Sequence, residues 1–324
     1  MQEERRMEKV RRTPAKLWKL VEDFSLEIVH RGDDFDTREI AISDVNRPAL
    51  QLVGFYDYFE PKRLQILGRA EMTYLIAMPL ERRRKVFEDF FRCNIPALIV
   101  ARNMEIFPEL LEIAQKHGRT LLRSTMSTVE ISSGIIDYLN RALAPQVTRH
   151  GVLVNIYGQG VLILGDSGIG KSETAIDLLK RGHRLVADDA VDIRKISNSL
   201  YGSAPEAIRH YIEIRGIGVI DVKQLFGMGA IQYETEIDMA IQLEQWVQGK
   251  VYDRLGLGEE RFELLDVSLP LVTVPVRPGR NLAGIVEIAT MKNREMKYGY
   301  NSAQDFVEQF DRRVDSLTHN GERK

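Results

Sequence analysis

The stretch VLILGDSGIGKSETAIDLLKRGHRLVADD, residues 161–189, decides the fold of this 324-residue chain. It starts with an apolar strand pattern, passes through a glycine-rich loop into a helical pattern, and ends in a second apolar strand. Residues 165–172 match the P-loop pattern G-x-x-x-x-G-K-(S/T), in the strand-to-helix context that this pattern requires. A crossover through a helix makes the two strands parallel, so both should end at one edge of the sheet. The stretch therefore predicts an α/β P-loop domain.

The loop and the helix behind it form a predicted phosphate site. Backbone N–H groups of a glycine-rich loop and of a helix N-terminus point at one anion. Lys171 adds a positive charge for the terminal phosphates, and the Ser172 hydroxyl can ligate Mg²⁺. The residues expected to bind a nucleotide are, in chain order, Gly165, Asp166, Ser167, Gly168, Ile169, Gly170, Lys171 and Ser172. The alternative, a plain glycine turn, is disfavoured by the motif.

Two adjacent acids, Asp188 and Asp189, follow the strand that should end beside this loop. One carboxylate next to Mg²⁺ is the Walker B arrangement, and a second could take a proton from an attacking hydroxyl. Consecutive strand residues point to opposite faces, so one of the two could instead be a turn or cap residue. The sequence thus predicts a catalytic or metal role for at least one of them.

His150 is placed by a hairpin that precedes the loop. Residues 151–157 and 160–164 are apolar strand patterns, and Gly158-Gln159 between them predicts a type II′ turn. Pairing the strands around that turn brings His150 close to Ser167, at the mouth of the P-loop. At that position the histidine is either a partner for a phosphate or hydroxyl group, or a bystander at the strand edge.

Two later segments have unusual compositions. Residues 213–221 mix acids, an arginine and glycines with apolar residues, which suits a loop lining a charged site or a bulged strand. Residues 275–280 predict a stiff turn. Its two arginines can each bind phosphate oxygens, or the turn is simply exposed to solvent without a ligand. That turn consists of Pro275, Val276, Arg277, Pro278, Gly279 and Arg280.

The length of the chain predicts about two domains, since single hydrophobic cores stop growing near roughly 250 to 300 residues. We predict an N-terminal α/β domain over residues 1–137, including a charged leader over residues 1–12. The C-terminal P-loop kinase domain, residues 138–324, should contain a mixed sheet. The junction is expected in a helix that begins with the capping box Ser127 to Glu130.

Composition narrows the classes of partner. A balance of 45 Lys and Arg against 47 Asp and Glu gives a net charge of −2, so nothing favours nucleic acid or an anionic membrane surface. Apolar stretches fall far short of the ~20 residues of a membrane span, and the leader lacks the apolar core of a secretory signal. The single cysteine, Cys93, cannot form an internal disulfide. We therefore expect a cytoplasmic protein without a membrane or nucleic-acid partner.

These motifs together resemble the bacterial HPr kinase/phosphorylase family, over about the whole chain after the leader. The resemblance rests on residues 150–154, 165–175, 187–189, 213–218, 253–256 and 275–280. The N-terminal half agrees more loosely, through Arg47-Pro48 and residues 64–68. Ala49, Arg149 and Asn155 depart from the family pattern, as does the charged leader. All of these lie off the phosphate chemistry, although Arg149 adjoins His150.

The resemblance implies an enzyme that phosphorylates one serine of the phosphocarrier protein HPr with ATP or pyrophosphate. It also implies removal of that group by inorganic phosphate, which yields pyrophosphate, and a homohexamer. By resemblance, Asp189 is the proton acceptor and donor, and His150, Lys171 and Arg254 are further catalytic residues. Ser172 and Glu213 would be the Mg²⁺ ligands, and residues 275–280 would serve chiefly in dephosphorylation.

Two other classes of function stay open on the sequence. The first is a P-loop kinase or ATPase that acts on a small molecule. The second is a non-catalytic nucleotide-binding switch, against which the intact Asp188-Asp189 pair argues.

Overall fold

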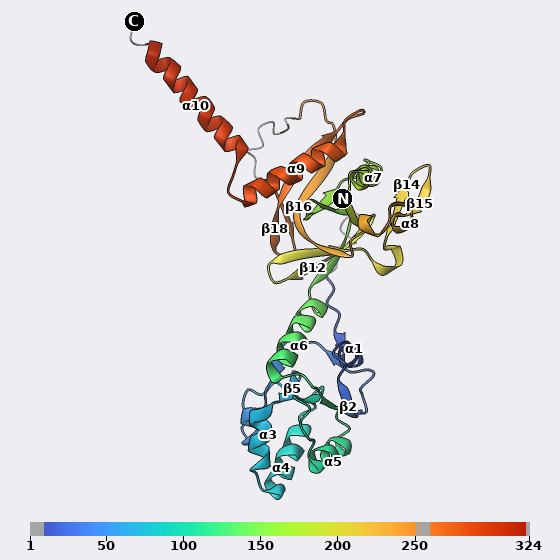
Figure 1. The fold of residues 1–324 in the computed structure, drawn as a ribbon, viewed down its shortest axis with the longest axis vertical. Coiled ribbons are helices and arrows are strands. Elements are labelled where there is room, and N and C mark those ends of the chain that lie inside the picture. The colour runs from blue at the N-terminus through green and yellow to red at the C-terminus, as the bar shows by residue number, and fades with distance from the viewer. Residues whose placement is uncertain (1–9, 251, 253–259, 322–324) are drawn as a thin grey trace. The chain divides into compact units, whose positions relative to one another are not determined.

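The computed structural model describes residues 10–250, 252 and 260–321 of the chain (Figure 1). Contacts divide these residues into two compact units, one over residues 12–144 and the other over the described residues from 145 onward together with residues 10 and 11. Each unit is described by itself. The junction that the sequence predicts, between residues 137 and 138, remains a prediction. Over the described ranges, no helix combines the length and the apolar character needed to cross a membrane.

The N-terminal unit is an α/β layer structure. Its strands are β1 (Ala15–Lys16), β2 (Glu27–His30), β3 (Glu39–Ile40), β4 (Val45–Asn46), β5 (Leu64–Leu67), β6 (Leu98–Val100) and β7 (Leu121–Arg123). Its helices are α1 (Leu17–Asp23), α2 (Ala49–Leu52), α3 (Arg69–Ile76), α4 (Leu80–Phe91), α5 (Pro108–Lys116) and α6 (Thr128–Ala142). The main sheet has the order β2-β7-β6-β5-β4, with β2 antiparallel to β7 and the other pairs parallel.

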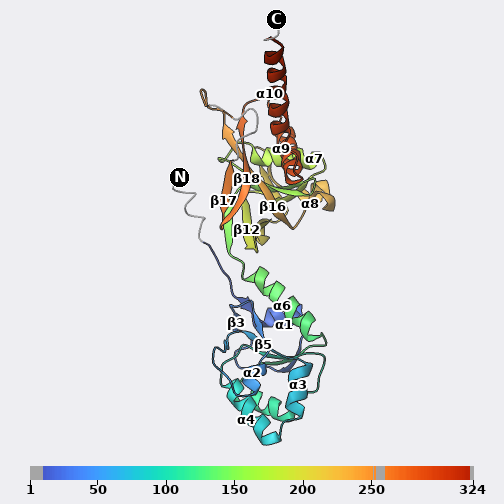
Figure 2. The same cartoon turned by 90° about the vertical axis from the view of Figure 1, so that its left-hand side faces the viewer.

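Alternating apolar residues of this sheet bury both of its faces. Ile66, Ile99 and Leu122 pack with residues of α1 and α6, whereas Leu67 and Leu98 pack with residues of α3, α4 and α5. Burial on both faces is what a parallel sheet requires. In both views the strands lie between α1 and α6 on one side and α3 and α4 on the other (Figures 1 and 2).

The predicted capping box at the start of α6 is confirmed. The backbone N–H of Ser127 donates to Glu130 Oε2 at 2.8 Å, and the N–H of Glu130 donates to Ser127 Oγ at 3.3 Å. These reciprocal bonds satisfy two of the N–H groups that a helix leaves free at its start.

The C-terminal unit is built on a mixed sheet, as the sequence predicted, and the structure shows that this sheet has nine strands. The strands of the unit are β8 (Gln146–His150), β9 (Val152–Ile156), β10 (Gln159–Leu164), β11 (Arg184–Ala187), β12 (Ala190–Ile196), β13 (Ser199–Ser203), β14 (Tyr211–Ile214), β15 (Gly218–Asp221), β16 (Glu234–Gln245), β17 (Arg261–Leu264) and β18 (Val267–Val276). Nine of them form the order β11-β9-β10-β16-β13-β12-β8, with β18 also pairing β16 and β17, while β14 and β15 form a separate two-stranded sheet.

Helices cover one face of the nine-stranded sheet. They are α7 (Lys171–Lys180), α8 (Val222–Phe226) and α9 (Leu282–Lys297). The unit also contains short 3₁₀ turns at Glu206–Ile208 and Met228–Ala230, and helix α10 (Ser302–Gly321), which extends away from the sheet (Figures 1 and 2). Leu178 of α7 and Val286 of α9 pack in one core with Val161 and Ile163 of β10. On the other face, Leu162 packs in a second core with residues of β12 and β13. The P-loop helix is thereby fixed against the centre of the sheet.

The relation between β10 and β11 follows the prediction. Strand β9 lies between them and is antiparallel to both, so β10 and β11 run in the same direction. Both strands therefore end at one edge of the sheet, where the P-loop and Asp188-Asp189 follow them.

The predicted pairing of strands β9 and β10 is wrong by two residues, and the predicted turn between them is therefore wrong as well. Gln159 pairs with Ile156, and the turn is Tyr157-Gly158, with φ of +52° and +89°. Two left-handed residues are typical of a type I′ turn, whose twist matches that of the flanking strands. The Asn155 side chain accepts the N–H of Gly158 at 3.1 Å, which stabilises this turn. A shift of two residues leaves every side chain on its predicted face of the sheet.

Candidate active site

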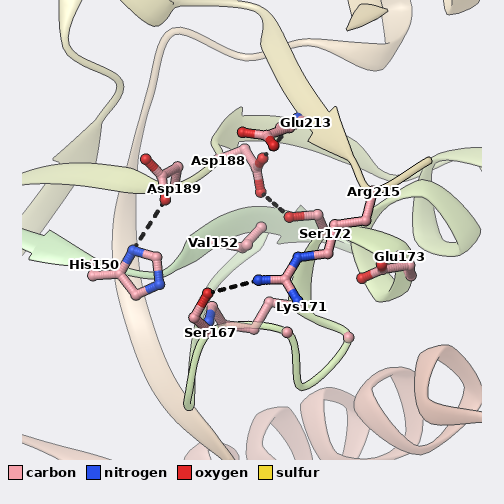
Figure 3. Close-up of a pocket in the computed structure, with 12 residues that line it drawn as sticks. His150, Val152, Ser167, Lys171, Ser172, Glu173, Asp188, Asp189, Glu213 and Arg215 are labelled. Carbon is pink, nitrogen blue, oxygen red and sulfur yellow. Dashed lines mark hydrogen bonds and ion pairs between the residues drawn. The ribbon is translucent and has the colours of Figure 1, made fainter. Parts of the chain in front are cut away.

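The carboxyl edge of the sheet carries a pocket lined by five segments of the C-terminal unit (Figure 3). The segments are the β8–β9 junction, the P-loop, the start of α7, the end of β11 and the β14–β15 hairpin. The lining residues are His150, Val152, Ser167, Gly168, Gly170, Lys171, Ser172, Glu173, Asp188, Asp189, Glu213 and Arg215.

Glycine is required in the P-loop by both conformation and space. Gly165 and Gly168 have φ of +145° and +81°, values that side chains disfavour. A Cβ on Gly165 would lie 2.6 Å from the Leu243 carbonyl oxygen, which is backbone, whereas one on Gly168 would meet only the end of the flexible Arg215 side chain, so at Gly168 the requirement is mainly conformational. Because the N-cap of α7 is Gly170, no side chain at that position can accept the first N–H groups of the helix. An anion is the partner that these N–H groups suit.

Lys171 is buried at the base of this loop. Its Nζ donates to the carbonyl oxygens of Gly165 and Asp166, at 2.7 and 2.9 Å. Burial lowers the pKa of the Lys171 ammonium, and the nearby carboxylates of Asp188 and Asp189 oppose that shift. The ammonium is thus held against the loop, where the terminal phosphates of a nucleotide are expected.

Asp188 is only 4% exposed, and both of its carboxylate oxygens accept hydrogen bonds. Ser172 Oγ donates to Oδ1 at 2.8 Å, and the Glu213 backbone N–H donates to Oδ2 at 3.2 Å. Burial raises the pKa of Asp188, an effect that the two hydrogen bonds oppose and the Asp189 charge reinforces. The carboxylate is therefore fixed beside the P-loop hydroxyl, as in a Walker B site.

Asp189 has the opposite environment. Its side chain is 72% exposed, and its Oδ1 lies 3.1 Å from His150 Nδ1. Its backbone has φ of +67°, which turns the side chain away from that of its neighbour (Figure 3). The exposed carboxylate can meet an incoming hydroxyl group, while the buried one cannot.

His150 lies at the P-loop mouth, as expected, although the predicted hairpin register is wrong. It ends strand β8, where it pairs with Ala190 of β12, and it lines the same pocket as Ser167. Its partner is the Asp189 carboxylate, an interaction that the sequence did not predict.

Residues 213–221, whose composition is unusual, form a β-hairpin that lines the pocket. Glu213 is on β14, opposite Val219 on β15. Arg215, at the turn, reaches back over the P-loop and donates from Nη2 to Ser167 Oγ at 3.1 Å (Figure 3). Sequence reasoning flagged this segment but did not name Arg215, Glu173 or Val152 as site residues. Arg215 could have been predicted as a site residue, because it precedes Gly216 in a segment that also contains the predicted metal ligand Glu213.

Several predicted site residues are not brought into the pocket. Gly165, Asp166 and Ile169 belong to the loop but do not line the pocket, and Ile169 is buried in the core below. The predicted turn over residues 275–280 is wrong at its start, because Pro275 and Val276 belong to strand β18 and pair with β16. The Arg277 guanidinium lies 3.3 Å from the centre of the Trp246 ring, and Arg280 Nη1 donates to the Pro275 carbonyl at 2.8 Å. Neither arginine lines the pocket. Arg254 lies outside the described residues.

The pocket offers oxygen ligands of the kind that Mg²⁺ prefers. In the part of the chain that the structure describes, no group of three or more His, Cys, Asp or Glu residues could hold a metal ion. Ser172, Asp188 and Glu213 nevertheless meet here, and their hydroxyl and carboxylate oxygens fit a Mg²⁺ ion that retains waters and phosphate oxygens.

Comparison with known proteins gives consistent matches over both units. The model of the HPr serine kinase C-terminal domain matches residues 141–310, and that of the HPr serine kinase N terminus matches residues 16–139. An HPr kinase/phosphorylase of Caldicellulosiruptor bescii is 50% identical over 91% of this chain and 96% of its own. One of Caldanaerobacter subterraneus subsp. tengcongensis is 52% identical, over 88% and 94%. A solved HPr(Ser) kinase/phosphatase of Coxiella burnetii is 37% identical, with a TM-score of 0.45, over 49% of this chain and 97% of its own.

Proposed function

The chain belongs to the HPr serine kinase family, and from that premise we propose that it phosphorylates a serine of HPr with ATP or pyrophosphate and reverses this by phosphorolysis. The observation that carries the proposal is the convergence at one pocket of Lys171, the Ser172–Asp188 pair and the His150–Asp189 pair. Phosphoryl transfer needs charge neutralisation, metal positioning and a proton acceptor, and these groups can supply all three.

In the forward direction, the loop N–H groups and Lys171 bind and neutralise the terminal phosphates of the donor. Ser172 and Glu213, together with Asp188, would hold Mg²⁺, which when bound neutralises charge between the phosphates. The serine oxygen bonds to the terminal phosphorus of the donor, and the bond from that phosphorus to the departing phosphate breaks. Asp189 takes the proton of the serine hydroxyl. His150 orients the Asp189 carboxylate through the contact at 3.1 Å.

In the reverse direction, inorganic phosphate attacks the phosphorus of phosphoserine. The bond between phosphorus and the serine oxygen breaks, protonated Asp189 returns its proton to that oxygen, and pyrophosphate leaves. One carboxyl group thus serves as base and as acid, which its exposure at the pocket mouth supports.

The contrast between the two acids supports a division of labour. Asp188 is buried with both oxygens engaged, so we assign it to the metal side of the site. Asp189 is accessible, so we assign it to the serine proton. A homohexamer, which the resemblance to the family implies, and a cytoplasmic location, which we expect from the composition of the sequence, complete the proposal.

The test is a two-step assay on the full chain. Incubation with purified HPr, ATP and Mg²⁺ should produce phosphoseryl-HPr, measured by intact-protein mass spectrometry. Removing the nucleotide and adding inorganic phosphate should then regenerate HPr and release pyrophosphate. Phosphorylation of small acceptors without HPr would favour a small-molecule kinase, and nucleotide binding without any turnover would favour a switch.

A further inference from the structure

The β14–β15 hairpin has two different faces. Ile212 is buried in the core beneath the P-loop helix, and Ile214 and Ile220 pack against the same core. The opposite face therefore carries Tyr211 and Glu213 on β14 and Val219 on β15, because side chains alternate along a strand. This second face lies at the pocket, since Glu213 lines it.

The pocket face exposes apolar surface next to a site residue. Val219 pairs directly with Glu213, and such cross-strand neighbours have Cβ atoms about 5 Å apart. Val219 is 69% exposed, Ile217 at the turn is 74% exposed, and Tyr211 is also exposed. Exposed apolar groups gathered beside a functional site mark a binding surface, whereas isolated ones need no explanation.

The hairpin is anchored so that this surface stays at the pocket mouth. One face is fixed by Ile212 in the core, and the Glu213 backbone N–H is bound to Asp188. Arg215 in the turn contacts Ser167 of the P-loop, so the turn reaches across the loop (Figure 3). A surface fixed in this way presents its apolar side chains without a large cost in entropy on binding.

We propose that Tyr211, Ile217 and Val219 form a docking surface for the protein that carries the accepting serine, and that they contact an apolar patch beside that serine. The proposal rests on the function proposed above. The pocket has a volume of about 190 Å³ and is far too small to hold a protein, whereas a specific protein complex buries on the order of 1,000 Å² or more. The protein substrate must therefore cover surface around Asp189, and this apolar face is continuous with the pocket that the serine must enter.

The test is the kinetics of Val219→Ser and Ile217→Ser, with Val219→Ile as a variant that keeps the apolar surface. Val129→Ser is the matched control, because Val129 is 76% exposed on α6 in the other unit. We expect the KM for HPr to rise roughly 5- to 10-fold in each serine variant, since a buried apolar side chain would lose its contacts. The kcat and the KM for ATP should stay within about twofold of wild type, and Val219→Ile and Val129→Ser should behave as wild type.

Three results would overturn the proposal. The first is an unchanged KM for HPr in both serine variants. The second is a parallel change in kcat and in the KM for ATP, which would mean that Val219 acts by placing Glu213. The third is a changed molar mass by light scattering, which would mean that a second copy of the chain covers the surface. A wild-type chain that does not phosphorylate HPr would instead contradict the proposed function itself.

Discussion

Both units contain a strand that runs through glycine into a helix, and the two joints serve different ends. In the N-terminal unit, β5 leads through Gly68 into α3, and the Gly68 N–H donates to Glu71 Oε2 at 3.0 Å. Glu71 is buried and is paired with Arg47 at 2.8 Å. A Cβ on Gly68 would lie 2.4 Å from Thr128 Oγ1, so side chains already fill the space at this helix start.

In the C-terminal unit, β10 leads through residues 165–170 into α7. The longer loop lines the pocket, and Lys171 at its end supplies a positive charge, whereas the joint before α3 is closed by the carboxylate of Glu71. The comparison teaches that the free N–H groups at the start of a helix suit an anion in both kinds of joint. The joint before α3 is closed by a carboxylate of the chain itself, whereas the loop before α7 leaves room for a ligand at the phosphate site that we propose.

The largest expected effect comes from removing the charge of the phosphate-binding joint. Lys171→Ala should reduce both phosphorylation and phosphorolysis on the order of 10³-fold or more, because both directions need the same phosphates neutralised. Rates with HPr and with phosphoseryl-HPr measure this. Lys180→Ala, at the exposed far end of α7, is the control and should be near wild type. A Lys171→Ala enzyme that keeps more than about a tenth of either activity, a loss below ~1.4 kcal/mol, contradicts the role.

The next effect concerns the two acids at the edge of this joint. Asp189→Asn should lower serine phosphorylation by roughly 10² to 10⁴, because the amide cannot accept a proton, while nucleotide binding survives. Asp188→Asn should instead weaken Mg²⁺-dependent nucleotide binding, because it disturbs the contact with Ser172. Single-turnover rates and nucleotide titrations distinguish the two. If Asp189→Asn loses binding but turns over normally at saturation, the roles must be exchanged.

A smaller effect is expected from the arginine turn over residues 275–280, a third candidate for anion binding. Arg277→Ala and Arg280→Ala should weaken phosphorolysis about tenfold more than phosphorylation, because inorganic phosphate is a separate nucleophile that needs its own charged hydrogen bonds. The ratio of the two activities at matched protein concentration is the measurement, with lysine variants expected to restore it only in part. Equal losses in both directions would assign the turn to folding or docking, as the Arg277–Trp246 contact also allows.

The smallest effect on catalysis tests the structural joint. Glu71→Gln should leave both activities near wild type and lower the free energy of unfolding of the N-terminal unit by about 1 to 3 kcal/mol, because it breaks a charge-assisted bond to Arg47 and Gly68. Denaturant unfolding at pH 7 measures this. Glu22→Gln, in an exposed pair with Lys19, should cost less than about 1 kcal/mol.

The pH dependence of that difference sharpens the test. Burial alone would raise the pKa of Glu71, but the bonds from Arg47 and from backbone N–H groups outweigh it, so its pKa is lowered from 4.5. A carboxyl with a lowered folded pKa stabilises the protein above its unfolded pKa and loses that contribution as the pH falls through the folded pKa. The gap between wild type and Glu71→Gln should therefore shrink below about pH 4. A gap that stays constant to pH 3 would mean that packing, not charge, is lost.

The sequence by itself determined the half of the site that we propose binds phosphate. The P-loop at residues 165–172, the strand before it and the parallel strand that ends in two acids all follow from local patterns and from the handedness of the crossover. His150 reached its expected place although the hairpin register was wrong, because an error of two residues keeps the faces of the strands. The family predicted from the resemblance is confirmed over both units by the two family models.

Only the tertiary structure decided which groups meet. Asp188 and Asp189 are neighbours in sequence, and their opposite burial depends on Ser172, Glu213 and His150, which other segments deliver. The contact of Arg215 with the P-loop and the position of Val219 beside Glu213 depend on the pairing of β14 with β15 and on where that hairpin packs. Periodicity fixes the face on which a side chain lies, but burial and charge environment come from long-range contacts that no local pattern encodes.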